Sequence, residues 1–199
     1  MLRPFTTLFL SLTLALTAYY PHDSCAAINI QAPPGNIEET TYDQTTIIEK
    51  ASTFFGDATE GLAKAIESSF QKHGRPNSYI EGQEVGGAMT VGVRYGDGML
   101  ISHNGSVRRI YWQGPSLGFD LGLNAAKVFT LVYHLPDIDA IFQRFPGVEG
   151  SLYYFAGFGV TYLENNGIVL VPIRLGVGFR TGASVGYLNI TSSPSWNPF

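Results

Sequence analysis

The sequence predicts a mainly β protein, in which a small closed antiparallel β-barrel of about eight strands has two or three helices packed against it. Bulky and bare residues alternate in two segments, 85–96 and 176–187. Successive side chains of a strand point to opposite faces, so each segment has one apolar face and one glycine face with a single arginine. The chain also contains 23 glycines and 13 phenylalanines. Because glycine lets a strand bend or approach another backbone, this pattern favours a tightly curved, closed sheet.

The first 27 residues have the pattern of a secretory signal peptide. Arg3 supplies a positive charge, residues 8–18 are apolar, and small residues at 26–27 offer a cleavage point. The apolar run is shorter than the roughly 20 residues that span a bilayer, so cleavage is expected rather than anchoring. Lipid attachment at Cys25 is a further alternative, which the polar residues 22–24 disfavour.

A single domain is expected after the signal peptide. Residues 28–44 are predicted to form a flexible arm, 45–191 a helix-plus-barrel domain, and 192–199 a tail. Cys25 is the only cysteine, so burial must hold the fold, which suits a bacterial periplasmic protein. The net charge of −4 and the lack of a basic run argue against nucleic acid as a partner.

Two amphipathic helices are predicted ahead of the strands. Gly56 interrupts the first helix, and Asp57 is expected to cap the second, with Glu60 completing a capping box. Gly74 follows the last turn of the second helix, where a left-handed terminator belongs. A third helix is predicted at 136–145. The buried stripe of the second helix has residues four apart: Leu62, Ile66 and Phe70.

Extended segments separated by turns make up the rest of the chain. Tight-turn signals are found at 96–98, 104–105 and 165–167. Segment 151–163 is apolar on both faces, so a helix is expected to cover its outer side. The predicted strands are 78–83, 86–95, 98–103, 107–113, 117–121, 127–134, 151–163 and 167–173, with 176–190 as a ninth strand or a continuation.

No residue set in the sequence has the spacing of a catalytic or metal site. His73, His103 and His134 lie on separate predicted elements, without paired metal-ligand spacing. The nucleophile-elbow pattern G-x-S-x-G is absent. The expectation is therefore a protein that is not an enzyme and that uses neither a metal nor a cofactor.

Four residues are candidates for a ligand site or a structural ion pair: Arg94, Arg180, Asp120 and Trp112. Both arginines share a strand face with glycines, so they are expected to point into the barrel, where a charge must be paired. Asp120 or Glu81 could neutralise one of them. Unpaired, the arginines would form a receptor for carboxylate or phosphate. Trp112 and Asp120 flank a proline turn, which is either a functional corner or part of the core.

A third feature is an excess of aromatic residues at 153–158 and at Tyr162. Such residues belong to the core when they are buried. An exposed part of the group would instead offer a docking patch.

Five longer motifs are similar to the EipA family of bacterial envelope-integrity proteins. They are RPNSYIEGQ at 75–83, VRYGDG at 93–98, YWQGPSLGFD at 111–120, YHLPDIDAIFQRF at 133–145 and IVLVPIRLGVG at 168–178. The resemblance covers residues 47–191. It implies an exported, soluble periplasmic protein with a small eight-stranded barrel, a role in keeping the envelope intact, and no established enzymatic activity. A fainter likeness of 114–124 to the SYLF lipid-binding domain adds lipid as a ligand class.

The expected function is non-enzymatic support of the cell envelope through binding of an envelope component. The component could be an envelope protein, a glycan or a lipid head group. The alternatives are a lipid- or anionic-ligand-binding barrel and an envelope hydrolase. After signal cleavage the protein is not expected to span the membrane, because residues counted back by twos from Phe199 are polar and prolines break the segment.

Overall fold

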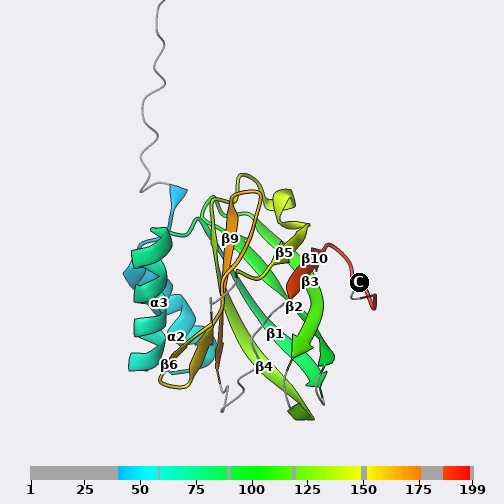
Figure 1. The fold of residues 1–199 in the computed structure, drawn as a ribbon. Helices are drawn as coiled ribbons and strands as arrows, with labels where there is room; N and C mark the ends of the chain where they lie inside the picture. Colours follow the sequence, from blue (N-terminus) through cyan, green and yellow to red (C-terminus); the bar gives the residue numbers. More distant parts are fainter. Residues whose placement is uncertain are drawn as a thin grey trace, which may run out of the picture. The chain divides into compact units, whose positions relative to one another are not determined.

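The computed structural model describes residues 40–57, 59–88, 91–117, 120–148, 152–175 and 186–197. Within these ranges the chain forms two α-helices, one short 3₁₀ helix and a ten-stranded sheet (Figure 1). The predicted signal peptide, residues 28–39 of the predicted arm and Arg180 lie outside the described residues. None of the helices in these ranges has the length and apolar character that crossing a membrane requires.

The two α-helices occur where the apolar periodicity predicted them. Helix α2 spans Gln44–Phe55 and helix α3 spans Glu60–His73. Gly56 and Gly74 follow them with φ values of 88° and 77°. Glycine suits these positions, because a residue with a Cβ atom is disfavoured at positive φ. Both helices therefore end where the sequence predicts, but only Gly56 is left-handed, with a ψ of 8°; Gly74 has a ψ of −142°, so the left-handed terminator predicted there is wrong.

The predicted cap of the second helix is wrong by two residues. Thr59, not Asp57, is the N-cap of α3, and its hydroxyl oxygen accepts a hydrogen bond from the backbone N–H of Leu62 at 3.3 Å. Glu60 is already the first residue of the helix. It therefore lies too early to complete the capping box that the spacing suggested.

The strands form one sheet in which paired neighbours run antiparallel. The strand order is β5-β10-β3-β2-β1-β4-β9-β7-β6, and β8 also pairs with β9. The mainly β class is confirmed. The bounds are β1 Ser78–Ala88, β2 Val91–Ser102, β3 Val107–Leu117, β4 Asp120–Tyr133, β5 Arg144–Pro146, β6 Tyr153–Phe155, β7 Phe158–Val160, β8 Leu163–Asn165, β9 Ile168–Leu175 and β10 Tyr187–Thr191.

The sheet curves into an open half-barrel, so the prediction of a closed barrel is wrong. Strands β5 and β8 have three residues each. Within the described ranges, the backbone pairing between the segments that carry them is one isolated bridge, between Gly147 and Leu163, beside a hydrogen bond from the Asn165 side chain to the backbone oxygen of Arg144. Strands this short cannot continue a ladder around the barrel, whereas β1 pairs with β2 along its whole length.

The segment Gly96-Asp97-Gly98 lies inside β2, so the turn predicted there is wrong. Its glycines serve close packing instead of chain reversal. A Cβ atom on Gly96 would clash with the indole ring of Trp112, and one on Gly98 would clash with the backbone of β1. Strands β1 and β2, which end at Ala88 and begin at Val91, pair antiparallel with Ala88 opposite Gly92.

The first alternating segment is therefore shared between two strands of a hairpin. Its glycine face still forms one continuous surface, because the register pairs even positions with even positions. Glu84 is opposite Gly96, and Gly86 is opposite Arg94. This face is the inner face of the half-barrel.

Two other predicted elements are divided in the structure. Segment 151–163 is not one strand, since Ala156 and Gly157 have positive φ values of 39° and 96° and separate β6 from β7. The helix predicted at 136–145 is reduced to the 3₁₀ helix η1, Ile138–Ile141. The end of that segment contributes instead to strand β5.

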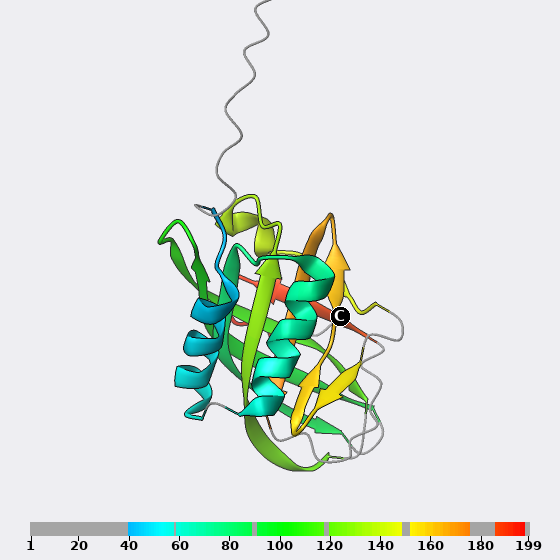
Figure 2. The same ribbon diagram turned by 90° about the vertical axis from the view of Figure 1, so that its left-hand side faces the viewer.

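The curved sheet separates two hydrophobic cores. Helices α2 and α3 pack side by side on one face of the sheet, as Figure 2 shows, and bury the helix-side core. The concave face encloses the inner core. The helix-side core includes Ile47, Leu62, Ile66, Phe129, Tyr133 and Val171, and the inner core includes Ile80, Leu100, Ile110, Trp112, Leu170 and Ile190.

Candidate functional site

The inner face holds a buried carboxylate between strands. Glu84 on β1 accepts hydrogen bonds from Nε and Nη2 of Arg174 on β9, at 3.2 and 3.3 Å. The indole N–H of Trp112 on β3 donates to the same carboxylate at 3.1 Å. The side chains of Arg174 and Glu84 are 13% and 11% exposed. Because both charges are withdrawn from water, each depends on the other for compensation.

Two nearby guanidinium groups determine the protonation of Glu84. Burial by itself would raise the pKa of this carboxyl, but the positive charges of Arg174 and Arg94, together with hydrogen bonds, lower it from 4.5 to about 2. Arg94 is 7% exposed. Burial lowers the pKa of Arg94 to about 10, although the charge of Glu84 opposes this change. All three groups are therefore charged at neutral pH.

The lowered pKa of Glu84 leads to a prediction about acid stability. Because the folded-state pKa is below the ordinary value of 4.5, ionised Glu84 stabilises the fold above that pH. This contribution should disappear as the pH falls from about 4.5 towards 2. We expect the melting temperature of the wild type to exceed that of Glu84→Gln most at pH 7, and the gap to narrow below pH 4.5. Thermal unfolding of both proteins between pH 7 and pH 2 measures the difference in melting temperature. A difference that stays constant over this pH range would contradict the prediction.

The structure describes two of the four candidate side chains. Arg94 and Trp112 both lie on the inner face, and Trp112 is 4% exposed. The side chain of Asp120 and all of Arg180 lie outside what the structure describes. The roles assigned to those two residues therefore remain predictions.

The suggestion that Glu81 neutralises an arginine is wrong for Arg94. Glu81 differs from Glu84 by an odd number of positions on β1, so the two side chains point to opposite faces. Burial raises the pKa of Glu81, and the charge of Lys50 on α2 opposes this effect. Glu81 therefore belongs to the helix side of the sheet.

Sequence reasoning missed Glu84 and Arg174. A usable signal for Glu84 was its even spacing from Gly82 and Gly86, which places it on the glycine face with Arg94. No comparable signal identified Arg174 as its partner, because 90 positions separate the two residues.

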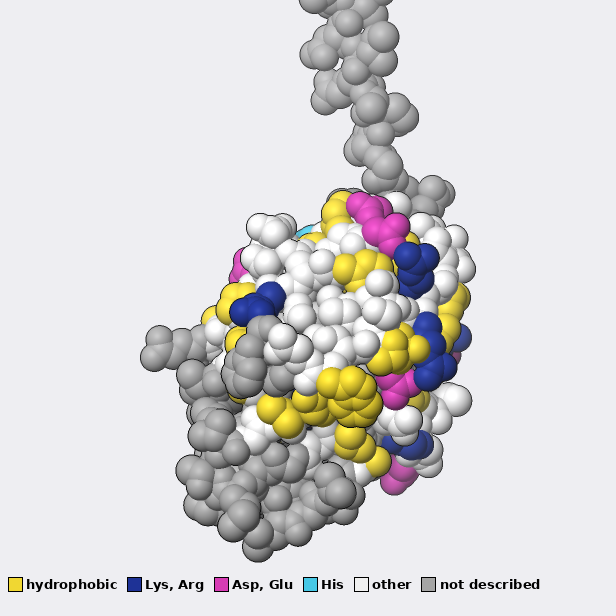
Figure 3. All heavy atoms as spheres, turned by 90° about the vertical axis from the view of Figure 1, so that its right-hand side faces the viewer, with side chains coloured by type: hydrophobic (Ala, Val, Ile, Leu, Met, Phe, Trp, Pro, Cys, Tyr) yellow, Lys and Arg dark blue, Asp and Glu magenta, His cyan; other side chains and the backbone are white. Residues whose placement is uncertain are grey.

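A groove lies on the outer face of strands β1, β2 and β3, with a volume of about 620 Å³. Figure 1 shows the chain after β10 on the opposite side of the molecule from the two helices, and Figure 3 shows hydrophobic side chains gathered on that side of the molecule. We call this the outer groove. Its lining includes Gln83, Tyr95, Asp97, Arg109, Tyr111, Gln113, Pro194 and Trp196.

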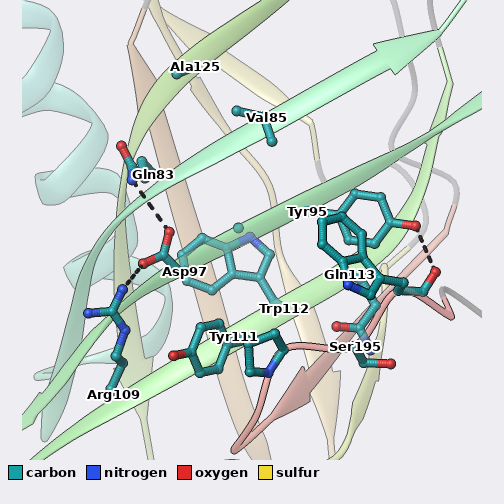
Figure 4. Close-up of a pocket in the computed structure, with 13 residues that line it drawn as sticks. Gln83, Val85, Tyr95, Asp97, Arg109, Tyr111, Trp112, Gln113, Ala125 and Ser195 are labelled. Carbon is teal, nitrogen blue, oxygen red and sulfur yellow. Dashed lines mark hydrogen bonds and ion pairs between the residues drawn. The ribbon is translucent and has the colours of Figure 1, made fainter.

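One end of the outer groove is polar. Arg109 donates to Asp97 at 2.7 Å, and Gln83 donates to the other oxygen of Asp97 at 3.4 Å (Figure 4). The side chains of Arg109 and Asp97 are 60% and 30% exposed. These planar groups therefore remain accessible to a ligand while holding one another in place.

The other end of the outer groove is aromatic, and the C-terminal tail forms part of it. The hydroxyl group of Tyr95 donates to the backbone oxygen of Trp196 at 3.0 Å. The two rings lie 5.6 Å apart, and Trp196 is 82% exposed. The segment expected to be a tail at 192–199 thus contributes lining residues to a site.

Gln113 is a buried polar residue in the lining of the outer groove. Its side chain is 1% exposed, and its amide nitrogen has no hydrogen-bond partner among the described atoms. A buried amide without a partner costs free energy unless another group accepts from it. The lining of the outer groove therefore contains a buried donor that has no acceptor among the described atoms.

The aromatic group at 153–162 differs from the outer groove. The ammonium group of Lys72 on α3 lies 4.5 Å from the ring centres of both Tyr153 and Tyr162. Tyr162 is buried, while Tyr153 and Tyr154 are 38% and 47% exposed. This group is therefore partly core and partly engaged by the chain's own helix.

No set of three or more metal-ligating side chains comes together in the part of the chain that the structure describes. The geometry presents instead a small, barrel-like β protein with a buried ion network on its inner face and an open aromatic groove on its outer face.

The chain belongs to the EipA family, because the model for envelope integrity protein A matches residues 40–199. The resemblance seen in the sequence motifs is thereby confirmed. The match extends beyond 47–191 and includes the tail segment that lines the outer groove. A role in envelope integrity follows from the family.

A solved structure supports the same fold. The chain is similar to the crystal structure of a beta-barrel-like, uncharacterized protein from Brucella abortus, with 45% sequence identity and a TM-score of 0.73. The similarity covers 80% of this chain and 99% of that one. The comparison with curated proteins found no match.

Proposed function

We propose that this protein maintains the cell envelope as an exported, periplasmic binding protein without catalytic activity, and that the outer groove binds an envelope component. The observation that carries the proposal is the outer groove itself, an open site in which aromatic and planar polar side chains are accessible together. Concave sites with a few placed polar groups are the usual form of ligand sites. Trp196 is 82% exposed although its ring contacts Tyr95, so most of this large apolar side chain is open to solvent.

The inner face supports the alternative of an anionic-ligand barrel less well. Glu84 already accepts hydrogen bonds from two nitrogens of Arg174. Its negative charge also stabilises the positive charge of Arg94. The inner core also packs bulky side chains such as Trp112 and Leu170. A ligand in this region would have to displace both the ion pair and the packing.

The test of the proposal is complementation of a deletion strain, scored as growth in the presence of detergent. We expect the wild-type gene to restore resistance, and Trp196→Ala and Tyr111→Ala to lose at least tenfold in plating efficiency at equal protein levels. The matched control is Tyr154→Ala, which removes an exposed tyrosine from β6, outside the outer groove. Full complementation by both groove variants would overturn the assignment of the function to this surface.

Catalysis is tested separately with purified protein on isolated sacculi and on lipid esters. The proposal expects no turnover above a buffer control. Turnover that persists through purification and disappears in a single-residue variant would show that the protein is a hydrolase.

A further inference from the structure

We infer that the outer groove binds a neutral glycan chain, and this inference rests on the proposed function. The first argument is charge. Asp97 and Arg109 are the charged residues in its lining, and they form an ion pair with each other at 2.7 Å. Their charges cancel at the site, so the groove offers no net attraction for a phosphate, a carboxylate or a basic peptide.

The second argument is the combination of side chains. Tyr95, Tyr111 and Trp196 line the groove, and aromatic rings can contact the apolar C–H face of a sugar ring. Gln83 and the ion pair provide planar donors and acceptors at the other end (Figure 4). A sugar presents both kinds of surface at once, with hydroxyl groups around its edge and C–H groups on its faces.

The third argument is the amide of Gln113. Its nitrogen is buried without a partner and lines the outer groove, so a hydroxyl oxygen of a bound sugar could accept its hydrogen bond. A site with an unsatisfied polar group selects ligands that satisfy it. An acyl chain cannot do so, and it would also remove water from Asp97 and Arg109 without compensation.

A peptide fits the outer groove less well than a glycan. The backbone of β2 at Tyr95 and Asp97 already pairs with β1 on one side and with β3 on the other. The part of the groove floor that β2 forms therefore has no free strand edge to which a peptide could add. Recognition must use side chains, which agrees with a sugar that stacks and accepts hydrogen bonds.

The experiment uses the full chain purified as the cell produces it, with three neutral hexasaccharides as probes: chitohexaose, maltohexaose and mannohexaose. The sequence contains two tryptophans. Trp112 is 4% exposed and Trp196 is 82% exposed, so acrylamide quenching reports mainly on Trp196. We expect at least one hexasaccharide to protect Trp196 from quenching in a saturable manner.

Two groove variants and one control variant test whether the saccharide binds in the outer groove. Because Tyr111 supplies a ring face and Gln113 the unpartnered donor, we expect Tyr111→Ala and Gln113→Leu each to weaken saccharide binding at least tenfold. Tyr154→Ala should bind as the wild type does. The wild-type melting temperature should also rise with saccharide concentration, since binding to the native state stabilises it.

Three outcomes overturn the inference: protection by none of the hexasaccharides, equal binding by wild type and groove variants, or protection only by vesicles of phosphatidylethanolamine and phosphatidylglycerol. These outcomes are separable from failure of the proposed function. If Trp196→Ala fails to complement and no hexasaccharide binds, the groove remains the functional site and the glycan class is wrong. If groove variants complement fully, the proposed function itself is wrong.

Discussion

Replacing Glu84 with glutamine is expected to destabilise the fold more than any neutralisation of a surface charge. The substitution retains the shape but removes the charge that compensates Arg174 and opposes the burial cost of Arg94. Removing one partner of a buried ion pair costs about 3–5 kcal/mol. A domain of this size shifts by roughly 2–4 °C per kcal/mol, so we expect a melting temperature about 6–20 °C lower.

The matched control for this variant is Asp97→Asn, in an ion pair on the outer face of the same sheet. Arg109 is 60% exposed there, and exposed pairs contribute about 0–1 kcal/mol. Differential scanning calorimetry at pH 7 and moderate salt compares the two variants directly. Equal melting temperatures for Glu84→Gln and Asp97→Asn would show that burial of the inner pair has no energetic consequence.

Trp112→Ala is the second variant with a large expected effect. The indole is 4% exposed, packs over Gly96 and Gly82, and donates to Glu84 at 3.1 Å. Deleting a buried tryptophan costs about 3–5 kcal/mol through lost burial and the cavity that remains. The loss of unfolding free energy should be at the upper end of this range, because the carboxylate of Glu84 also loses a hydrogen-bond donor.

Trp196→Ala is the control, because it deletes the same side chain at a position that is 82% exposed. Substitutions at such surface positions change stability by about 0.5 kcal/mol or less. Urea unfolding of both variants, with the wild type alongside, measures the contrast. If Trp196→Ala proved as costly as Trp112→Ala, the tail would be an integral part of the fold.

Much of the fold was predictable from short-range patterns. Periodicities of about four and of two residues identify the faces of a helix and of a strand, and they located α2, α3 and parts of β1, β2, β3, β4 and β9. The strands predicted at 86–95, 117–121 and 151–163 are wrong, because each extends across the ends of observed strands. The glycine face was also predictable, because strand parity decides that Arg94 shares its side with Gly96. The family resemblance was carried by contiguous motifs, and these need no tertiary information.

The errors in the predicted fold arose where a local sequence pattern is explained by a residue that is distant in the sequence. Gly96-Asp97-Gly98 has the composition of a turn, but its glycines are required by the indole of Trp112 on the next strand. The sequence likewise predicts a curved sheet without deciding whether it closes. Closure depends on the pairing between β5 and β8, which is reduced to one bridge in the described residues.

The sequence by itself determined the class of the fold, the faces of the strands and the family. Tertiary structure alone decided the partner of Glu84, which lies 90 positions away on β9, and the position of the tail on the outer groove. The physical reason is that parity gives the direction of a side chain but not its neighbour across the sheet. Trp196 becomes part of a site only because the curvature of β2 and the path after β10 bring its backbone within hydrogen-bonding distance of Tyr95.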